Sequence, residues 1–242
     1  MNATAIIPAR YASTRLPGKP LLSETGKPLI QHVVEIVSKA HAISRVVVAT
    51  DDRRIVEAVE GFGGQAVMTR AEHTCGTDRI NEAAALLGLE DGQVVVNVQG
   101  DEPDIPPACL TTLVRLLDSS RADMATLATP LPASRANDPN RVKVALALDS
   151  SAMYFSRAPI PFDRDGTGRT RYLLHLGVYA YRVAFLKRFA SLPPTPAEQA
   201  EKLEQLRALE YGHRIVVAAV EYEGVGIDTP KDYAEFVARR RG

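Results

Sequence analysis

The chain has 242 residues, and its 29 Lys plus Arg balance 29 Asp plus Glu to a formal charge of zero. A general nucleic-acid-binding protein usually carries a basic excess, so this balance argues against that class while leaving room for a local basic pocket. The length corresponds to one large domain or a domain with a subdomain, and we expect a single domain over residues 1–242. No CxxC pair is present, so Cys75 and Cys109 predict neither a zinc ribbon nor a disulfide framework and suit a reducing compartment.

The sequence also carries no pattern typical of targeting or of membrane insertion. Residues 1–8 lack the basic start and the long apolar stretch of a signal peptide. No apolar run approaches the roughly 18 residues that a membrane helix needs. We therefore expect a cytoplasmic protein with no membrane partner.

The first 130 residues alternate expected strands with expected helices. Short apolar runs predict strands at 3–8, 45–50, 65–68 and 93–98. Apolar residues at helical spacing predict helices at 28–40, 52–62, 78–87 and 107–117. Continuously apolar strands separated by helices are typical of parallel βαβ units that are covered on both faces. This part of the sequence therefore predicts an α/β fold with a mostly parallel central sheet.

The pattern changes after residue 130. Strands are expected at 141–148, 151–155, 173–181 and 214–220, with a polar loop at 162–171 and a closing helix at 230–241. One helix is expected over 195–211, because Thr195 suits the N-cap, Pro196 suits the first helical position and Glu198 completes a capping box. We expect this half to complete the first sheet and to add a small antiparallel layer.

Charged side chains follow the expected parallel strands, where ligands of open α/β sheets bind. The edge at these carboxyl ends should gather Arg10, Arg15, Lys19, Arg70 and Asp101. Three cations within ten residues suit a polyphosphate, because each contact neutralises charge and Arg can bind two oxygens at once. A solvated surface loop is the alternative. Neither GxxxxGK[ST] nor GxGxxG occurs, so a Walker A loop and a nicotinamide-binding fold lack their main signals.

Two aspartates are candidate metal ligands. Asp101 comes directly after an apolar strand, and a carboxylate there is costly unless it is paired or binds a metal. Mg²⁺ takes one or two carboxylates together with phosphate oxygens, so Asp101 facing a cationic loop favours a nucleoside-triphosphate site. The alternative for Asp101 is a turn cap before Pro103, and the alternative for Asp228 is an N-cap for the helix that begins at Pro230.

Other candidate residues are ambiguous when taken alone. His175 suits a hydrogen-bonded, half-buried histidine within a strand, and no HExxH or GxSxG pattern is present. Cys75 precedes a helix start, where a thiol pKa can fall, but no partner for a nucleophile is evident. Glu204 and Gln205 suit an exposed face of the helix at 195–211.

With these residues in view, the chain resembles the family of 3-deoxy-manno-octulosonate cytidylyltransferases, also called CMP-KDO synthetases. The resemblance begins with IIPAR at 6–10 and STRLPGKPL at 13–21. Further matching segments follow in the same order at 49–51, 68–70, 76–79, 96–103, 154–157, 175–179, 201–207 and 226–230. The opening segments alone would indicate only sugar nucleotidyltransferases in general, including CMP-sialate synthetases.

The resemblance implies a Rossmann-like nucleotidyltransferase fold and a role for each matching residue. It implies that 1–130 is mainly CTP-binding and that 131–225 is mainly sugar-binding and dimer-forming. The implied CTP ligands are Arg10, Arg15, Lys19, Arg70, Cys75, Gly76, Thr77 and Gln99, with Arg10, Lys19 and Asp101 catalytic. Asp101 and Asp228 are implied to hold Mg²⁺. The acid sugar is implied to contact Gln99, Arg157, His175, Tyr179, Glu204 and Gln205, with Arg157 the partner for its carboxylate.

The implied reaction is an in-line displacement, in which the anomeric hydroxyl of the sugar attacks the α-phosphorus of CTP and pyrophosphate leaves. Positioning two anions together is the main demand on the protein. The resemblance further implies a homodimer and a role in lipopolysaccharide assembly. Three features depart from the family pattern: Cys75 replaces a usual Ser, Phe162 replaces a common Trp, and 163–171 is shorter than usual.

Alternative functions stay open at this point. A related cytidylyltransferase for sialic acid or for an 8-amino analogue of the octulosonate would share the chemistry. A non-catalytic nucleotide-sensing module would share the fold, although it need not keep both metal carboxylates. A glycosyltransferase usually shows a DxD motif, and Asp163 and Asp165 have that spacing, but they lie in a late polar loop.

Overall fold

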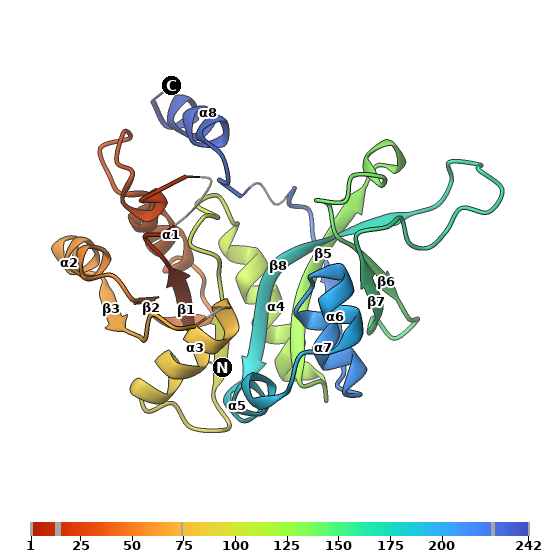
Figure 1. The fold of residues 1–242 in the computed structure, drawn as a ribbon, viewed down its shortest axis with the longest axis horizontal. Helices are drawn as coiled ribbons and strands as arrows, with labels where there is room; N and C mark the ends of the chain where they lie inside the picture. The colour runs from red at the N-terminus through yellow and green to blue at the C-terminus, as the bar shows by residue number, and fades with distance from the viewer. Residues whose placement is uncertain (1, 13–15, 74, 224–225, 242) are drawn as a thin grey trace.

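A computed structural model describes residues 2–12, 16–73, 75–223 and 226–241. Its centre is a sheet in the order β3-β2-β1-β4-β8-β5-β9 (Figure 1). Neighbours β3, β2, β1 and β4 run parallel, β8 runs antiparallel to both β4 and β5, and β9 runs parallel to β5. The expected mostly parallel, mixed sheet is therefore confirmed, and β8 is the strand that reverses direction within this order.

The strands fall close to their expected positions in most cases. Their bounds are β1 Ala3–Ala9, β2 Ile43–Thr50, β3 Gln65–Met68, β4 Val94–Asn97, β5 Met124–Leu131, β6 Lys143–Leu146, β7 Ala152–Ser156, β8 Tyr172–Arg182 and β9 Ile215–Ala219.

The helices cover both faces of the sheet and follow the expected positions in the first half. Their bounds are α1 Leu29–Val37, α2 Arg53–Gly61, α3 Gly76–Leu86, α4 Pro107–Ser119, α5 Val183–Ser191, α6 Pro196–Glu201, α7 Gln205–Glu210 and α8 Pro230–Arg241. Two 3₁₀ turns, η1 Lys19–Leu21 and η2 Ala133–Arg135, lie in loops.

Alternating side chains of the strands pack into two separate cores. Along β1, Ala5 and Ile7 join the core formed with α1, α2 and α4, whereas Ile6 joins the core formed with α3, α5 and α7. Burial on both faces explains why the strands read as continuous apolar runs in the sequence. The helix layers leave the carboxyl ends of β1 and β4 to loops.

The small antiparallel layer expected from the sequence is formed by β6 and β7. These strands pair with each other, and β6 joins the extended start of β8 through Lys143 and Leu174. Figure 1 shows this layer and the loop before β8 projecting away from β1–β3. The last helix, α8, packs against the start of α1 through Tyr233, Phe236 and Val237.

One expectation in the second half needs correction, and two elements were missed. The single helix expected over 195–211 is wrong: α6 and α7 are separate, because Lys202 between them has a left-handed backbone with φ of 54°. The capping box at Thr195 is present. Strand β5 was not expected, because the change of pattern was set at residue 130, inside it. Helix α5 was not expected either, because it continues from β8 without a polar break.

Among the described residues, no helix is both long enough and apolar enough to cross a membrane. This agrees with the absence of long apolar runs in the sequence.

Candidate active site

A cluster of opposite charges lies where the loops after β1 and β4 meet the segment before α8. The ammonium of Lys19 donates to Asp101 Oδ2 at 2.6 Å and to the carbonyl of Ile227 at 2.9 Å, and it lies 3.7 Å from Asp228 Oδ1. These residues are distant in sequence, so the fold alone brings them together. The predicted meeting of Lys19 and Asp101 at this edge is confirmed.

Two glycines allow the loops to adopt these positions. Gly18 has φ of 67°, which favours glycine, and it starts the 3₁₀ turn that carries Lys19. A Cβ on Gly100 would lie 3.1 Å from the carbonyl oxygen of Pro8, so glycine lets the loop after β4 approach the end of β1. The backbone N–H of Ile227 donates to the carbonyl of Asp101 at 2.9 Å and joins the third segment.

The two carboxylates form a donor set that suits Mg²⁺. Both approach the same ammonium, so both can face a single cation, and Asp101 and Asp228 keep 26% and 46% of their side-chain surface exposed. No group of three or more His, Cys, Asp or Glu with metal-binding geometry occurs in the described part of the chain. A site with two carboxylates fits Mg²⁺ when phosphate oxygens and water supply the other ligands.

The remaining predicted phosphate and base residues occupy different positions around this cluster. Arg10 donates to the carbonyls of His73 and Cys75, so it holds the loop before α3 against the end of β1. Arg70 is 71% exposed and its Nε lies 3.2 Å from Oε1 of Glu82, in the middle of α3. Arg15 lies outside the described residues.

The start of α3 presents Cys75, Gly76 and Thr77. The sulfur of Cys75 accepts from the N–H of Asp78 at 3.4 Å and so acts as the N-cap of α3. Burial, with the nearby carboxylate of Glu204, raises the pKa of the Cys75 thiol, so the sequence argument against a nucleophile gains support. Backbone N–H groups at a helix start suit the polar edge of a bound nucleotide.

Thr77 also joins the predicted nucleotide side to the predicted sugar side. Its hydroxyl donates to Glu204 Oε2 at 2.7 Å, between α3 and the start of α7. Gln205 is 5% exposed, and its Nε2 has no hydrogen-bond partner among the described residues. The exposed-face alternative for these two residues is therefore wrong. A buried amide without a partner is costly, which favours a ligand at this place.

His175 and Tyr179 lie four residues apart on β8. Gln99, just after β4, contacts the backbone of β8 between them. The ring centroids of His175 and Tyr179 are 5.4 Å apart, and His175 also contacts Phe155. Loss of water lowers the pKa of His175 to about 3, so its imidazole is neutral at physiological pH. Gln99 Nε2 donates to the carbonyl of Gly177 at 3.3 Å, which fixes the Gln99 side chain against β8.

Arg157 is held by main-chain carbonyls. Its Nε and its two terminal nitrogens donate to Glu201, Pro139 and Lys202 at 2.7, 2.9 and 3.5 Å, respectively. The carboxylate of Glu201 accepts from the backbone N–H of Arg157 at 2.9 Å. Arg157 thus connects the end of β7 to the left-handed junction of α6 and α7. Its contact with a sugar carboxylate stays a prediction.

A cleft of about 450 Å³ opens beside the charged cluster, between the end of β4 and the start of β6. The carboxyl of Glu102 lies in its wall, where burial and the neighbouring Asp101 raise the Glu102 pKa to about 7. The residues that line the cleft are Glu102, Arg135, Asp138, Asn140, Arg141, Val142, Leu174, His175, Leu176, Gly177, Glu223, Gly226, Asp228 and Asp232.

Sequence reasoning did not single out Glu102, Arg135 or Arg141. Glu102 directly follows Asp101, so the rule of searching strand ends contains it. The two arginines lie in the polar segment after β5, and that strand was itself not expected. Recognition of β5 as a strand would have directed the search to the residues that follow it.

Comparison with known proteins agrees with this geometry. The model of the cytidylyltransferase family matches residues 4–215. The 3-deoxy-manno-octulosonate cytidylyltransferase of Syntrophobacter fumaroxidans is 52% identical over 96% of this chain and 94% of that protein. The 8-amino-3,8-dideoxy-manno-octulosonate cytidylyltransferase of Shewanella halifaxensis is 49% identical over 96% of each chain.

A solved structure gives the same result in three dimensions. The structure of CMP:2-keto-3-deoxy-manno-octonic acid synthetase complexed with CTP superposes with a TM-score of 0.94 and 43% identity, over 100% of this chain and 99% of that one. The expected nucleotidyltransferase fold is therefore confirmed. With the family model matching most of its length and relatives near 50% identity, the chain belongs to the cytidylyltransferase family.

Proposed function

We propose that this protein transfers CMP from CTP to 3-deoxy-manno-octulosonate, giving the CMP-sugar and pyrophosphate. The observation that carries the proposal is the Lys19, Asp101 and Asp228 cluster at the mouth of a polar cleft. The ammonium of Lys19 suits the phosphates of a nucleoside triphosphate, and the two carboxylates suit its metal ion. The adjacent cleft provides space for a second substrate. The relative from S. fumaroxidans carries the name of this activity.

CTP binds across the ends of β1 and β4 in this proposal. Arg10, Arg15 and Lys19 neutralise the phosphates, which suits cations at the end of a parallel strand. Arg70, Cys75, Gly76 and Thr77 line the cytosine pocket, and Gln99 lies between the nucleotide and the sugar. The side chain of Arg70 is 71% exposed, so it is accessible to the base. In this arrangement its guanidinium either leaves Glu82 or binds the base while the ion pair with Glu82 is kept.

Asp101 and Asp228 are the residues that would hold Mg²⁺. When bound, the ion neutralises charge on the phosphate oxygens of CTP and aligns them for displacement. The Lys19 ammonium lies beside the same two carboxylates, and it stabilises the charge that develops on the leaving pyrophosphate. The ion pair that Lys19 makes with Asp101 keeps this ammonium beside the reaction site before the substrates arrive.

The sugar acid binds along β8, where His175 also lines the cleft. Gln99, Tyr179, Glu204 and Gln205 provide hydrogen bonds to its hydroxyls. His175 is neutral, so it can donate or accept a hydrogen bond with the sugar without adding a charge to the site. This arrangement gives the buried amide nitrogen of Gln205 a hydrogen-bond acceptor, which it otherwise lacks among the described residues.

The bond changes are those of an in-line displacement at phosphorus. The anomeric oxygen of the sugar forms a bond to the α-phosphorus, and the bond between that phosphorus and the bridging oxygen of pyrophosphate breaks. The protein contributes no covalent intermediate, so its task is to hold the two reactants in line. Lys19 and Arg10 stabilise the charge that moves onto pyrophosphate.

The 8-amino analogue of the octulosonate is a second candidate sugar. Relatives named for it are 49% identical to this chain, and two relatives named for the octulosonate are 52% and 49% identical. The small difference in identity gives 3-deoxy-manno-octulosonate the preference. Competition between the two sugars for CTP, followed by mass analysis of the CMP-sugar, separates them.

We also propose a cytoplasmic homodimer whose product supplies lipopolysaccharide assembly. The β6 and β7 layer exposes Leu148, Met153 and Tyr154, and the loop before β8 exposes Phe162 at 82%. Large apolar side chains grouped on one projecting layer favour contact with a second copy. Light scattering at several concentrations tests the dimer, and Met153→Glu with Leu148→Glu should shift it to the monomer.

The direct test of the activity is pyrophosphate release from CTP with Mg²⁺. Release should require CTP and the octulosonate together. Sialic acid and the 8-amino sugar, and then ATP, GTP and UTP, replace the substrates in turn. A chain that binds CTP but releases no pyrophosphate with any sugar acid would instead be a nucleotide-sensing module.

A further inference from the structure

The residues before α3 form a loop that the proposed function assigns to the cytosine base. This base loop, residues 69–73 and 75, runs from the end of β3 to the N-cap of α3. Cytosine carries an amino donor where uracil carries a carbonyl acceptor, so hydrogen-bonding groups of the loop distinguish the two bases only when their directions are fixed. The contacts that fix this loop therefore bear on which nucleotide the site accepts.

Both carboxylate oxygens of Glu82, in the middle of α3, contact the base loop. Glu82 Oε2 accepts from the backbone N–H of Arg70 at 2.9 Å and from Nε2 of His73. Glu82 Oε1 lies 3.2 Å from Nε of Arg70. A single carboxylate therefore holds the main chain of the loop at Arg70 and the side chains of Arg70 and His73.

The carboxylate and the imidazole of this network are largely shielded from water. The side chains of Glu82 and His73 keep 19% and 10% of their surface exposed. Burial alone would raise the pKa of Glu82, but the hydrogen bonds from His73 and from the N–H of Arg70 outweigh it, so the Glu82 pKa lies below its ordinary value. Glu82 is therefore ionised at neutral pH, and because a carboxylate only accepts, Nε2 of His73 is the donor.

The same helix holds the start of the loop through a residue less than one turn away. Arg79, three residues before Glu82 on α3, has no exposed surface. Its guanidinium donates to Thr69 Oγ1 at 2.5 Å and to Asp51 Oδ2 at 2.9 Å. Residues three apart on a helix share a face, so Arg79 and Glu82 bind the loop as neighbours. The helix whose start borders the base therefore also fixes the loop that precedes it.

The far end of the loop is joined to a proposed phosphate ligand. Arg10 donates to the carbonyl of His73 and, at 3.4 Å, to the carbonyl of Cys75. His73 therefore contacts Glu82 with its ring and Arg10 with its main chain. A shift of the loop would move the base contacts relative to the phosphate contacts.

We propose that Glu82 is a positioning residue for base selection, which holds the base loop in the arrangement that accepts cytosine and rejects uracil. The proposal rests on the proposed function, because it takes the base loop as part of the cytosine site. Glu82 acts through Arg70 and His73 and not by contact with the nucleotide. A loop that is fixed before the ligand arrives loses little entropy on binding and keeps its hydrogen-bonding groups in direction.

The test compares pyrophosphate release from CTP and from UTP by the wild-type protein, Glu82→Ala and Glu82→Gln. Glu82→Ala should lower kcat/KM for CTP by about 10- to 100-fold, because a small misplacement of binding groups costs that much. The preference for CTP over UTP should fall by about 10-fold or more. The KM for the sugar should stay within about twofold, since the Glu82 carboxylate bonds only to the base loop among the described residues.

Glu82→Gln tests rescue by a conservative change. Its amide oxygen can still accept from the N–H of Arg70, while the charge that faces the guanidinium is lost. This variant should therefore lose CTP preference in the same direction as Glu82→Ala but to a smaller extent. If Glu82→Ala does not fold, Glu82→Gln carries the comparison, and a wild-type base preference in it would contradict the proposal.

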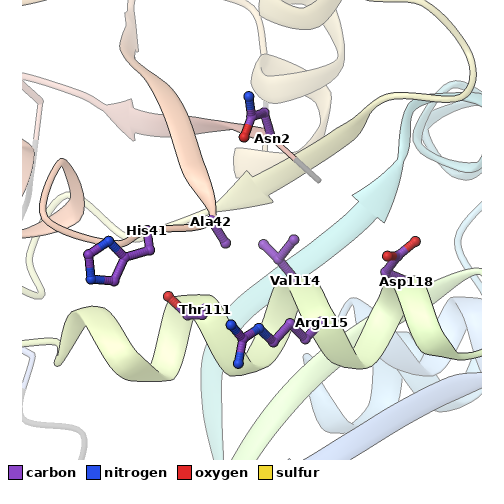
Figure 2. Close-up of a pocket in the computed structure, with 7 residues that line it drawn as sticks. All are labelled: Asn2, His41, Ala42, Thr111, Val114, Arg115 and Asp118. Atoms are coloured by element: carbon purple, nitrogen blue, oxygen red, sulfur yellow. The ribbon is translucent and has the colours of Figure 1, made fainter.

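Asp118→Asn is the matched control, because it also replaces a carboxylate on a helix by its amide. Figure 2 shows Asp118 with Arg115 and His41 in a separate pocket of about 190 Å³, at the amino ends of β1 and β2 and so at the edge of the sheet opposite the base loop. These three side chains are exposed, and no hydrogen bond or ion pair joins them in the described part of the chain. Asp118→Asn should leave kcat/KM and the base preference unchanged.

A second measurement follows the loop without turnover. In the protein without substrates, the backbone N–H of Arg70 should exchange with deuterium at least about 10-fold faster in Glu82→Ala than in the wild-type protein, as measured by NMR. Calorimetry then compares the binding of CTP and of UTP in both proteins, with thermal unfolding as the check on folding. Unchanged exchange at Arg70, or faster exchange with the preference for CTP intact, would overturn the proposal.

The proposed function and the role of Glu82 fail in different ways. A wild-type protein that releases no pyrophosphate with any sugar acid contradicts the proposed function, while the binding of CTP and UTP still reports on Glu82. An active wild-type protein, with Glu82 variants that keep the base preference of the Asp118→Asn control, retains the function and removes Glu82 from base selection.

Discussion

The nucleotide side and the sugar side of the cleft are built in different ways. On the nucleotide side, Lys19, Asp101 and Asp228 lie on loops, keep part of their surface exposed and bind one another. On the sugar side, His175 and Tyr179 lie within a strand, and Arg157 and Lys143 are fixed by main-chain carbonyls. The hydroxyl of Thr77 joins the two sides through Glu204.

This difference indicates what each side requires. A partly exposed ion cluster can exchange one set of partners for another, which suits a substrate that brings four negative charges and a metal. A scaffold of buried hydrogen bonds changes little on binding, which suits recognition of hydroxyls by shape and direction. Substitutions on the nucleotide side should therefore reduce the rate, whereas substitutions on the sugar side should reduce stability and sugar affinity.

The largest expected loss of turnover comes from substitution of the two carboxylates on the nucleotide side. Asp101→Asn and Asp228→Asn should each lower turnover by about 10²–10³-fold or more, because an amide cannot hold Mg²⁺ beside the phosphates. Thermal unfolding should stay close to that of the wild-type protein, since both side chains are partly exposed. Near-normal turnover in both variants would remove these residues from the metal site.

Lys19→Ala should give the next largest effect. Turnover should fall by about 10²-fold, since one donor to the developing charge is lost, while the KM for the sugar should change little. Full kinetics with both substrates measure this split. A rise in sugar KM with normal turnover would instead assign Lys19 to the sugar side of the cleft.

Lys143→Met tests the scaffold of the sugar side. The carbonyls of Asp138 and Arg157 lose their donor, so the free energy of unfolding should fall by about 1–3 kcal/mol. The sugar KM should rise because the turn at Asp138, which lines the cleft, loses support. Urea unfolding gives the energy, and Lys231→Met, at a side chain that is 86% exposed, is the control. Unchanged stability in Lys143→Met would contradict the scaffold interpretation.

The pH dependence of stability tests whether the sugar side holds His175 in its neutral form. Its pKa is about 3 in the folded protein and about 6.5 when unfolded, so the unfolded chain binds more protons between these values. Stability should therefore fall as pH decreases through this window, and His175 should contribute about 2 kcal/mol of the loss between pH 7 and pH 5. His175→Gln should flatten the profile. An equally steep profile in that variant would show that His175 is not held neutral.

The sequence contained most of the first half of the fold and the charged part of the site. Strands and helices alternate along the chain up to α4, so local periodicity matches the three-dimensional arrangement. Lys19 and Asp101 follow parallel strands, and strand ends meet at one edge of a sheet, which made their meeting predictable. The resemblance added Asp228, for which spacing alone favoured a helix cap.

The second half was less predictable for physical reasons. Lys202 adopts a left-handed backbone that its residue type does not favour, so nothing in the local pattern marked the break between α6 and α7. The buried state of Lys143 depends on the carbonyls of Asp138 and Arg157, which lie on either side of it in the sequence.

The most direct measurement of the central claim is pyrophosphate release from CTP in the presence of Mg²⁺, with and without 3-deoxy-manno-octulosonate. Release should require both substrates, with formation of the CMP-sugar in equal amount. Release that is the same without the sugar, or absent with every sugar acid while CTP binds, would contradict the proposed activity.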